Sequence, residues 1–202
     1  AFQGGSLVVF VRSTSEGAKD ETPVDLDEVG RAVDEALGGS LRAFADEERF
    51  DGKAGTSKTM SVFGHGVKRV VLVGLGPGGK DPDWRLAGAT AGAALRAVNG
   101  GSAGFACVDG VCVQDLVEGI VLGLHADRRF KGSQTPEKQR TGEGMGPSSV
   151  ELLGPLPPES SAVSERAEAV ASGVLFAREL VNAPANILTP PALAAAATDL
   201  GA

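Results

Sequence analysis

The sequence predicts an α/β protein whose sheet contains both parallel and antiparallel strands. Short apolar runs rich in valine alternate with segments that have helical spacing, which favours strands and helices in layers. Two of the apolar runs are separated by only four residues, which suits an antiparallel hairpin. The hydrophobic share of 42% can build a core, mostly of Ala, Val, Leu and Gly, since only 4% of the 202 residues are aromatic.

The first half of the chain predicts three strands and two helices. Residues 6–11 form a buried strand, after which Leu26 to Leu37 show helical spacing, with Asp25 as the helix cap and Gly38-Gly39 as its end. Residues 41–50 continue as a second helical piece. Residues 59–64 and 69–74 are the two hairpin strands, and residues 65–68 connect them.

The second half predicts further alternation and a long helix. Helices are expected at 83–98, which is rich in small residues, and at 113–124, despite two glycines; strands are expected at 104–108 and 149–154. The Gly, Ser, Pro and charge composition of 131–149 predicts a long, mobile loop. Apolar residues at spacings of four and three then predict a helix with one apolar face, through Val163, Ala167, Val170, Val174, Ala177 and Val181.

Charge and cysteine content limit the possible partners. With a net charge of −7, the chain repels a phosphate backbone, so we expect no nucleic-acid partner and interpret Arg128, Arg129 and Lys131 as a solvated loop. Two cysteines, Cys107 and Cys112, indicate an intracellular, reduced protein and are interpreted as buried, inert thiols. No apolar run approaches the ~20 residues that span a bilayer, so no membrane association is expected.

A glycine-rich segment follows the strand at 69–74. Gly74, Gly76 and Gly79 fit the dinucleotide pattern G-x-G-x-x-G, and Gly74 to Lys80 fits most of a Walker loop. Asp81 stands where a Walker loop needs Ser or Thr, and prolines interrupt the dinucleotide pattern. A turn that needs positive φ is therefore the favoured interpretation, and the candidate phosphate ligands are the backbone amides of Gly74, Gly76, Gly78 and Gly79.

The residue pattern contains no catalytic or metal site. The two histidines, His65 and His125, have no His or Cys at ligand spacing, whereas a zinc site needs three or four converging ligands. No serine lies in a G-x-S-x-G elbow, and the carboxylates are scattered. We therefore expect no catalytic residue and no cofactor on this chain.

The segment "VNAPANILTP" predicts a rigid joint between two helices. Pro184 ends the long helix, and Asn182 and Asn186 favour local turns. Thr189 and Pro190 are typical of a helix cap and first helical position. A joint of this kind orients one domain against another. The following alanine-rich helix is short and should fray, fold back or seek another molecule when alone.

The joint resembles the junction segment of leucyl aminopeptidases, the two-metal cytosol aminopeptidase family. "FDGKAGTSKTM", "KRVVLVGLG" and "VEGIVLGLHADRRFKG" are similar to that family's N-terminal segments in the same order, although relatives often carry Tyr near the place of His125. The resemblance implies a macro-domain-like α/β/α sandwich at 1–160, a linker helix at 161–183, and a junction with the start of a missing catalytic domain at 184–202.

The resemblance also implies the function. This chain would be the non-catalytic N-terminal part of a hexameric metallopeptidase that removes N-terminal residues from peptides, and would be inactive alone. Its partners would be its own catalytic domain, which would carry two Zn²⁺ or Mn²⁺ ions, and further copies of the subunit. The alternative is a macro-like module that binds a phosphate-bearing ligand at Gly74 to Gly79. A start at Ala1 suits either an organelle protein after removal of a leader or a cut chain, so cytoplasm and plastid both stay open, as does the substrate preference.

Overall fold

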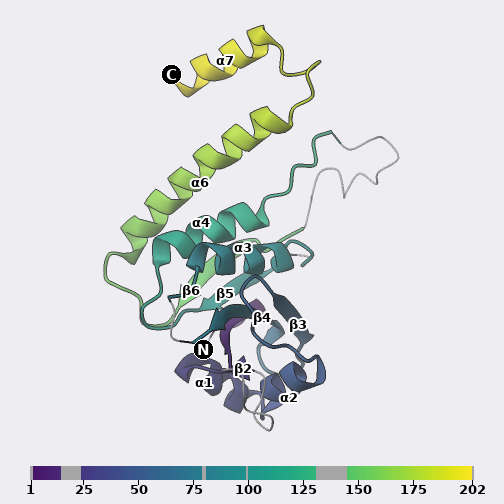
Figure 1. Cartoon of the computed structure of the whole chain (residues 1–202), viewed down its shortest axis with the longest axis vertical. Helices are drawn as coiled ribbons and strands as arrows, with labels where there is room; N and C mark the ends of the chain where they lie inside the picture. The colour runs from purple at the N-terminus through teal and green to yellow at the C-terminus, as the bar shows by residue number, and fades with distance from the viewer. Residues whose placement is uncertain (1, 15–23, 79–80, 99, 131–144, 202) are drawn as a thin grey trace.

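The computed structural model describes residues 2–14, 24–78, 81–98, 100–130 and 145–201 (Figure 1). Its strands are β1 (Gly4–Ser13), β2 (Val24–Asp25), β3 (Ser57–Ser61), β4 (Val67–Pro77), β5 (Ser102–Ala106) and β6 (Ser149–Leu153). Its helices are α1 (Glu28–Ala36), α2 (Ser40–Glu47), α3 (Trp84–Leu95), α4 (Val113–Leu124), α6 (Ser160–Asn182) and α7 (Pro190–Leu200). Most of the predicted loop 131–149 lies outside the described residues.

The strands form one six-stranded sheet, and the predicted mixture of parallel and antiparallel strands is confirmed, whereas β2 was not predicted. Its order is β3-β4-β1-β5-β6, and β2 pairs with β1 beside this path. Strand β1 is parallel to β4 and β5, and β5 is parallel to β6, whereas β3 and β2 are antiparallel to their neighbours. The central strands are buried on both faces, which explains why β1 and β4 are continuous valine-rich runs rather than alternating patterns.

Helices cover both faces of the sheet and give three layers (Figure 1). Helices α3 and α4 lie over one face, where Phe10 meets Trp84 edge-to-face with ring centroids 5.4 Å apart. Helices α1 and α2 lie over the other face and bury Leu26, Leu41 and Phe50 against β1 and β4. The predicted α/β/α sandwich is therefore confirmed. None of the helices in the described ranges is long and apolar enough to cross a membrane.

Helices α3 and α4 are in backbone contact through four glycines. Gly88 and Gly92 on α3 face α4, and Gly119 and Gly123 on α4 face α3. A Cβ at Gly92 would lie only 2.7 Å from the carbonyl oxygen of Ile120, so a larger side chain there would force the helices apart. Both helices carry the G-x-x-x-G spacing that places two glycines on one face, which is how closely packed helix pairs are built.

The predicted cap of the first helix is wrong. Asp25 belongs to β2 and pairs with Arg12 of β1, and the cap is Asp27, whose carboxylate accepts a hydrogen bond from the Gly30 amide at 2.7 Å. The antiparallel β1–β2 pairing keeps Asp25 extended, so the helix begins only at Glu28. Burial and the nearby Asp25 carboxylate raise the pKa of Asp27 above its ordinary value.

The prediction that both cysteines are buried is confirmed for Cys107 and wrong for Cys112. Cys107 is fully buried after β5, and burial raises its pKa to about 11. Cys112 is exposed because it occupies the N-cap position of α4, where the chain has extended backbone before the first helical turn.

Candidate functional site

The fully buried residues of the long helix α6 lie in its first half. They include Ala167 and Ala171, and Ala167 belongs to the core that α3 and α4 form with the sheet. Of the predicted apolar face, Val170 and Val174 are instead exposed, and Val181 is 84% exposed. The predicted apolar face is therefore covered only in part: Ala171 is buried, while Val170 and Val174 on either side of it are exposed, and α4, with 12 residues against 23 in α6, is too short to run along the whole helix.

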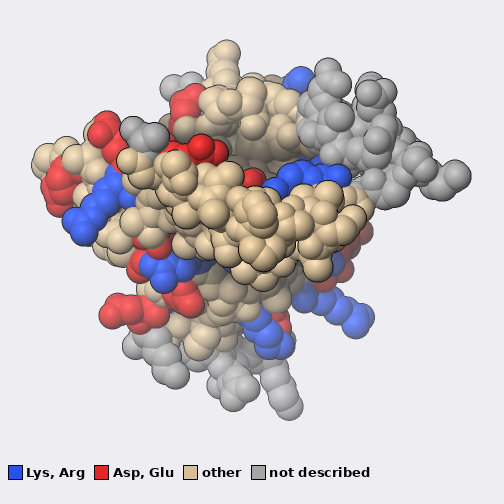
Figure 2. All heavy atoms as spheres, turned by 90° about the horizontal axis from the view of Figure 1, so that it is seen from above, with Lys and Arg blue, Asp and Glu red and all other residues tan. Residues whose placement is uncertain are grey.

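The apolar side chains beyond α6 are exposed or only half-buried among the described residues. No residue of α7 is buried; Leu193 and Leu200 are exposed, the latter by 68%. Ile187 in the turn before α7 is exposed too. Figure 1 shows α7 set apart above the sandwich, and Figure 2, seen from above, shows it as an almost uncharged band. We call α7, the turn before it and the exposed end of α6 the junction surface.

The turn between the helices has the local geometry that its residues predict. Ala183 before Pro184 is extended, at φ −69° and ψ 131°, because the proline ring disfavours a helical conformation there. The carbonyl oxygen of Pro184 accepts hydrogen bonds from the amides of Ile187 and Leu188 at 2.8 and 2.9 Å. These two bonds close a compact turn.

The remaining predicted junction residues lie around this turn. Thr189 is the N-cap of α7 and is extended, but its side chain makes no capping hydrogen bond, so its backbone alone starts the helix. Pro190 follows at the first helical position, as predicted. Asn182 is the last residue of α6, and Asn186 lies exposed in the turn.

A cluster of polar groups ties the segment after α4 to the end of α6. The guanidinium of Arg129 donates to Asp127 at 3.1 and 2.9 Å and to the carbonyl oxygen of Glu179 at 2.8 Å. The Asn182 amide also bonds the Asp127 carboxylate. We call these four residues the Arg129 clasp. Hydrogen bonds from Arg129, and to a smaller extent from Asn182, hold the pKa of Asp127 well below its usual range.

The clasp bears on the interpretation of Arg128, Arg129 and Lys131 as a solvated loop. Arg129 joins two elements, and its guanidinium also lies 5.1 Å from the ring centre of Phe130. Arg129 is exposed and lies in a loop, as the solvated-loop interpretation expects, but its hydrogen bonds give it a structural role that this interpretation did not include; Lys131 lies outside the described residues. The sequence does not reveal this connection, because Asp127 is a near neighbour of Arg129 but Glu179 is fifty residues away along the chain.

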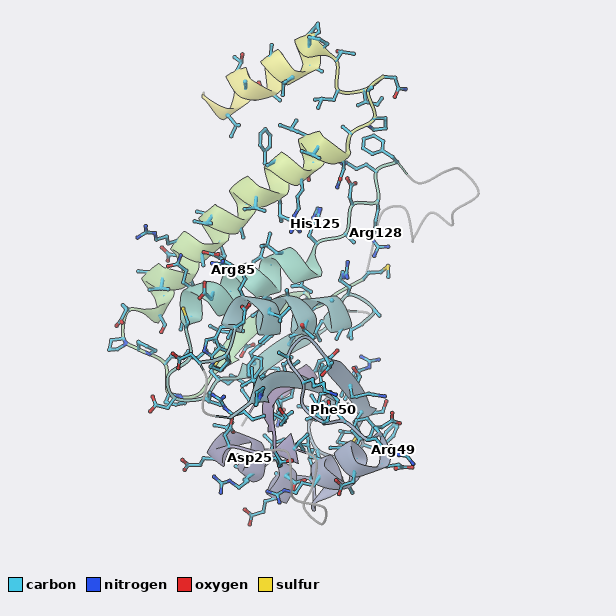
Figure 3. The ribbon with its side chains drawn as sticks, viewed as in Figure 1. Asp25, Arg49, Phe50, Arg85, His125 and Arg128 are labelled. Carbon is cyan, nitrogen blue, oxygen red and sulfur yellow. The ribbon has the colours of Figure 1, made fainter. Side chains whose placement is uncertain are left out.

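The described residues do not assemble a metal centre. Within them, no group of three or more His, Cys, Asp or Glu side chains comes together. His125 lies at the end of α4, on the side of α6 (Figure 3), and its carbonyl oxygen accepts from Arg96 at 3.2 Å. His65 lies in the turn between β3 and β4, on another part of the molecule.

The glycine-rich segment is used for packing. Strand β4 runs on to Pro77, so the loop expected from Gly74 starts later. The amide of Gly74 donates to the Thr56 carbonyl and that of Gly76 to the Gly52 carbonyl, each at 2.9 Å. Both glycines are buried, Gly76 with φ +82°. Gly78 is exposed, and Gly79 lies outside the described residues.

A cavity at the carboxyl ends of the parallel strands carries the wrong charge for phosphate. Doubly wound sheets bind ligands at this edge. The cavity has a volume of about 350 Å³ and is lined by one cation and four acids, which are Arg12, Asp25, Asp27, Glu28 and Asp109. Its acidic balance would repel an anionic ligand.

Comparisons with known proteins match the chain over nearly its whole length. The sequence model of the cytosol aminopeptidase family, N-terminal domain, matches residues 8–134. The chain is 33% identical to the chloroplastic leucine aminopeptidase 2 of Arabidopsis thaliana, over 98% of the chain and 34% of that protein. It is 33% identical to a probable cytosol aminopeptidase of a Cyanothece species, over 89% of the chain and 37% of that protein.

A solved structure agrees with the sequence matches. A mutant of tomato leucine aminopeptidase superposes with a TM-score of 0.74 at 32% identity, over 98% of this chain and 39% of that one. The chain thus spans about a third of the length of the curated relatives it matches. The family match, the relatives and the shared fold lead to one conclusion: the chain belongs to the cytosol aminopeptidase family and contains its N-terminal domain.

Proposed function

We propose that this chain is the non-catalytic assembly domain of a leucyl-aminopeptidase-like enzyme that removes N-terminal residues from peptides. The sandwich at 1–160 would be oriented through the linker helix at 161–183 against a catalytic domain whose start lies, with the junction, at 184–202. The observation that carries this proposal is the junction surface, on which four large aliphatic side chains are exposed, namely Val181, Ile187, Leu193 and Leu200. Such a surface is typical of an interface with another domain.

The same proposal covers the metal ions and the assembly. Two-metal hydrolysis needs clustered carboxylate ligands, and the described residues offer no such cluster. We therefore assign the Zn²⁺ or Mn²⁺ ions to the catalytic domain of the full-length protein. The junction surface would be covered by that domain inside a hexamer. The names of relatives, chloroplastic and cytosol aminopeptidases, support an intracellular location in plastid or cytoplasm.

The alternative, a macro-like phosphate-binding module, is not favoured. The amides of Gly74 and Gly76 are already bonded to backbone carbonyls, and the nearby strand-end cavity is acidic. Calorimetry with ADP-ribose, ATP and NAD would test it. A dissociation constant below roughly 10 μM, about −7 kcal/mol, would restore the alternative.

The activity assay separates this chain from the full-length enzyme. We expect the 202-residue chain to release no product from a leucyl anilide with Mn²⁺ or Zn²⁺, while the full-length protein does so under the same conditions. Turnover by the chain above the metal-only blank would contradict the proposal.

The assembly role has its own test, in the full-length protein. We expect Val181→Asp to lower the fraction of hexamer in light scattering, because a charge would then lie in the covered junction. Phe63→Asp is the matched control, since Phe63 is equally exposed, at 86% against 84%, but lies in the β3–β4 turn. Equal loss of hexamer in both variants, or in neither, would refute the assembly role.

A further inference from the structure

Among the described residues, no strand pairs with the outer side of the edge strand β6. It is the last strand of the sheet, and within the described ranges its only neighbour is β5. All five of its residues are exposed or half-buried, in contrast to the buried β5. An edge strand of this kind offers backbone N–H and C=O groups to a further extended segment.

An apolar groove continues the face of β6 that points toward α4 and α6. Val150 and Leu152, two residues apart in the strand, line it from the sheet side, and Ile120 and Leu124 of α4 line it from the helix side. Its volume is about 480 Å³. Because side chains alternate along a strand, a segment added beside β6 would direct every second side chain into this groove.

The two charged residues that line the groove are both acidic. Glu165 and Glu168 of α6 lie at the groove, and Glu151 projects from the opposite face of β6, between Val150 and Leu152. An added strand would therefore meet an aliphatic groove on one face and the Glu151 carboxylate on the other. Opposite charges on neighbouring strands stabilise the pairing, and like charges oppose it.

We propose that β6 and the α4–α6 groove form a docking site for an extended segment of a partner protein in which aliphatic and basic side chains alternate. The aliphatic side chains fill the groove, and a basic side chain pairs with Glu151. A second copy of this chain fits less well, since edge-to-edge pairing of two β6 strands brings Glu151 of each copy close to that of the other. This site is separate from the junction surface and does not depend on the assembly role.

The test uses the whole 202-residue chain and a labelled peptide in which lysine and valine alternate. The peptide is acetylated at its N-terminus and has about seven residues, which is long enough to pair along a whole edge strand. Fluorescence anisotropy should show saturable binding, and hydrogen exchange should show new protection of the amides of residues 149–153. A peptide with glutamate in place of lysine should not bind. Failure of the lysine peptide to bind at millimolar concentration would overturn the proposal.

Charge reversal locates the site. Glu151→Lys should weaken binding of the lysine peptide about fivefold to tenfold, as expected for replacing an attractive cross-strand pair by a repulsive one, and should allow the glutamate peptide to bind. Glu47→Lys is the matched control, because Glu47 is exposed on α2, on the other face of the sheet. Equal effects of the two substitutions would mean that only the net charge matters, and would overturn the proposed site. Concentration-dependent dimerisation in light scattering, accompanied by exchange protection of the amides of residues 149–153, would overturn it in favour of a second copy at this edge.

Discussion

Replacing Gly92 by alanine should destabilise the protein, although the same change stabilises most helices. The new Cβ would meet the Ile120 carbonyl oxygen at 2.7 Å and the Leu124 amide at 2.8 Å, while ordinary contact begins at 3.4 Å. Helices α3 and α4 must therefore separate by about 0.7 Å. All the atoms in contact belong to the backbone of α4, so no side chain can rotate away.

The magnitude follows from two opposing terms. Overpacking a closely packed contact costs about 1–3 kcal/mol, and we expect the upper end because the obstacle is backbone. Alanine recovers about 1 kcal/mol of helix propensity relative to glycine. The net loss of about 2 kcal/mol should lower Tm by roughly 4–8 °C for a chain of this size.

The matched control is Gly173→Ala in α6. Gly173 is also helical, but a Cβ added there would have no atom within 4 Å, so only the propensity term remains. This variant should be more stable than the parent by up to about 1 kcal/mol. Thermal unfolding followed by circular dichroism measures both. If Gly92→Ala is as stable as Gly173→Ala, the two helices are not in backbone contact, and the proposed role of the four glycines is refuted.

Three further outcomes follow from the structure. One thiol, Cys112, should react rapidly with a disulfide reagent at pH ~8, while Cys107, with its pKa raised to about 11 by burial, should react only on unfolding; fast labelling of two thiols would contradict this. Gly74→Ala should destabilise more than Gly92→Ala in the same unfolding assay, because its Cβ would press into the backbone around Gly52. The low folded pKa of Asp127 means that its stabilising contribution is complete above the ordinary carboxyl pKa of about 3.9 and is lost only as pH falls further. Amides at the end of α6 should thus stay protected from exchange at pH ~4.5, and loss of protection between about pH 6 and 4.5 would argue against the clasp.

The sheet could be predicted well because its signal is local. The valine-rich runs in β1 and β4 are buried on both faces. Such a strand is recognised from its own continuous run of apolar residues, without knowing which strands pair with it. The strand boundaries could be predicted less closely: β5 begins at Ser102, two residues before the predicted start, because Ser102 pairs with Ser149 of β6, and this pairing rather than apolarity sets where the strand begins.

The glycines illustrate what sequence reasoning misses. At Gly74 and Gly76 the pattern is compatible with a phosphate loop, while the structure uses both for a close approach to the segment around Gly52. The repeated G-x-x-x-G spacing in α3 and α4 is the signal that could have revealed their contact. Glycine fits a ligand loop and a packed backbone equally well, because both require only the absence of a side chain.

The junction could be predicted from the sequence, but its anchoring could not. Pro184 and Pro190 define the turn through their own backbone restrictions, so local sequence suffices. The Arg129 clasp joins residues fifty positions apart, which one sequence does not reveal. Exposure of Val174 and Val181, on a face whose spacing predicts burial, likewise depends on how far α4 extends.

The partial anchoring of α6 makes it a lever arm. From Ala171, its last buried residue, to Asn182 the helix extends about 17 Å, at 1.5 Å per residue. A rotation of roughly 5° about the anchored part would therefore move the far end by about 1.5 Å, a displacement on the scale that matters for aligning reacting groups. The Arg129 clasp contacts α6 near Asn182, far from its buried part. A restraint at that distance limits rotation of the helix more than the same restraint close to Ala171 would. Small side-chain changes at the clasp should thus alter the position of everything after the junction while leaving the sandwich itself unchanged.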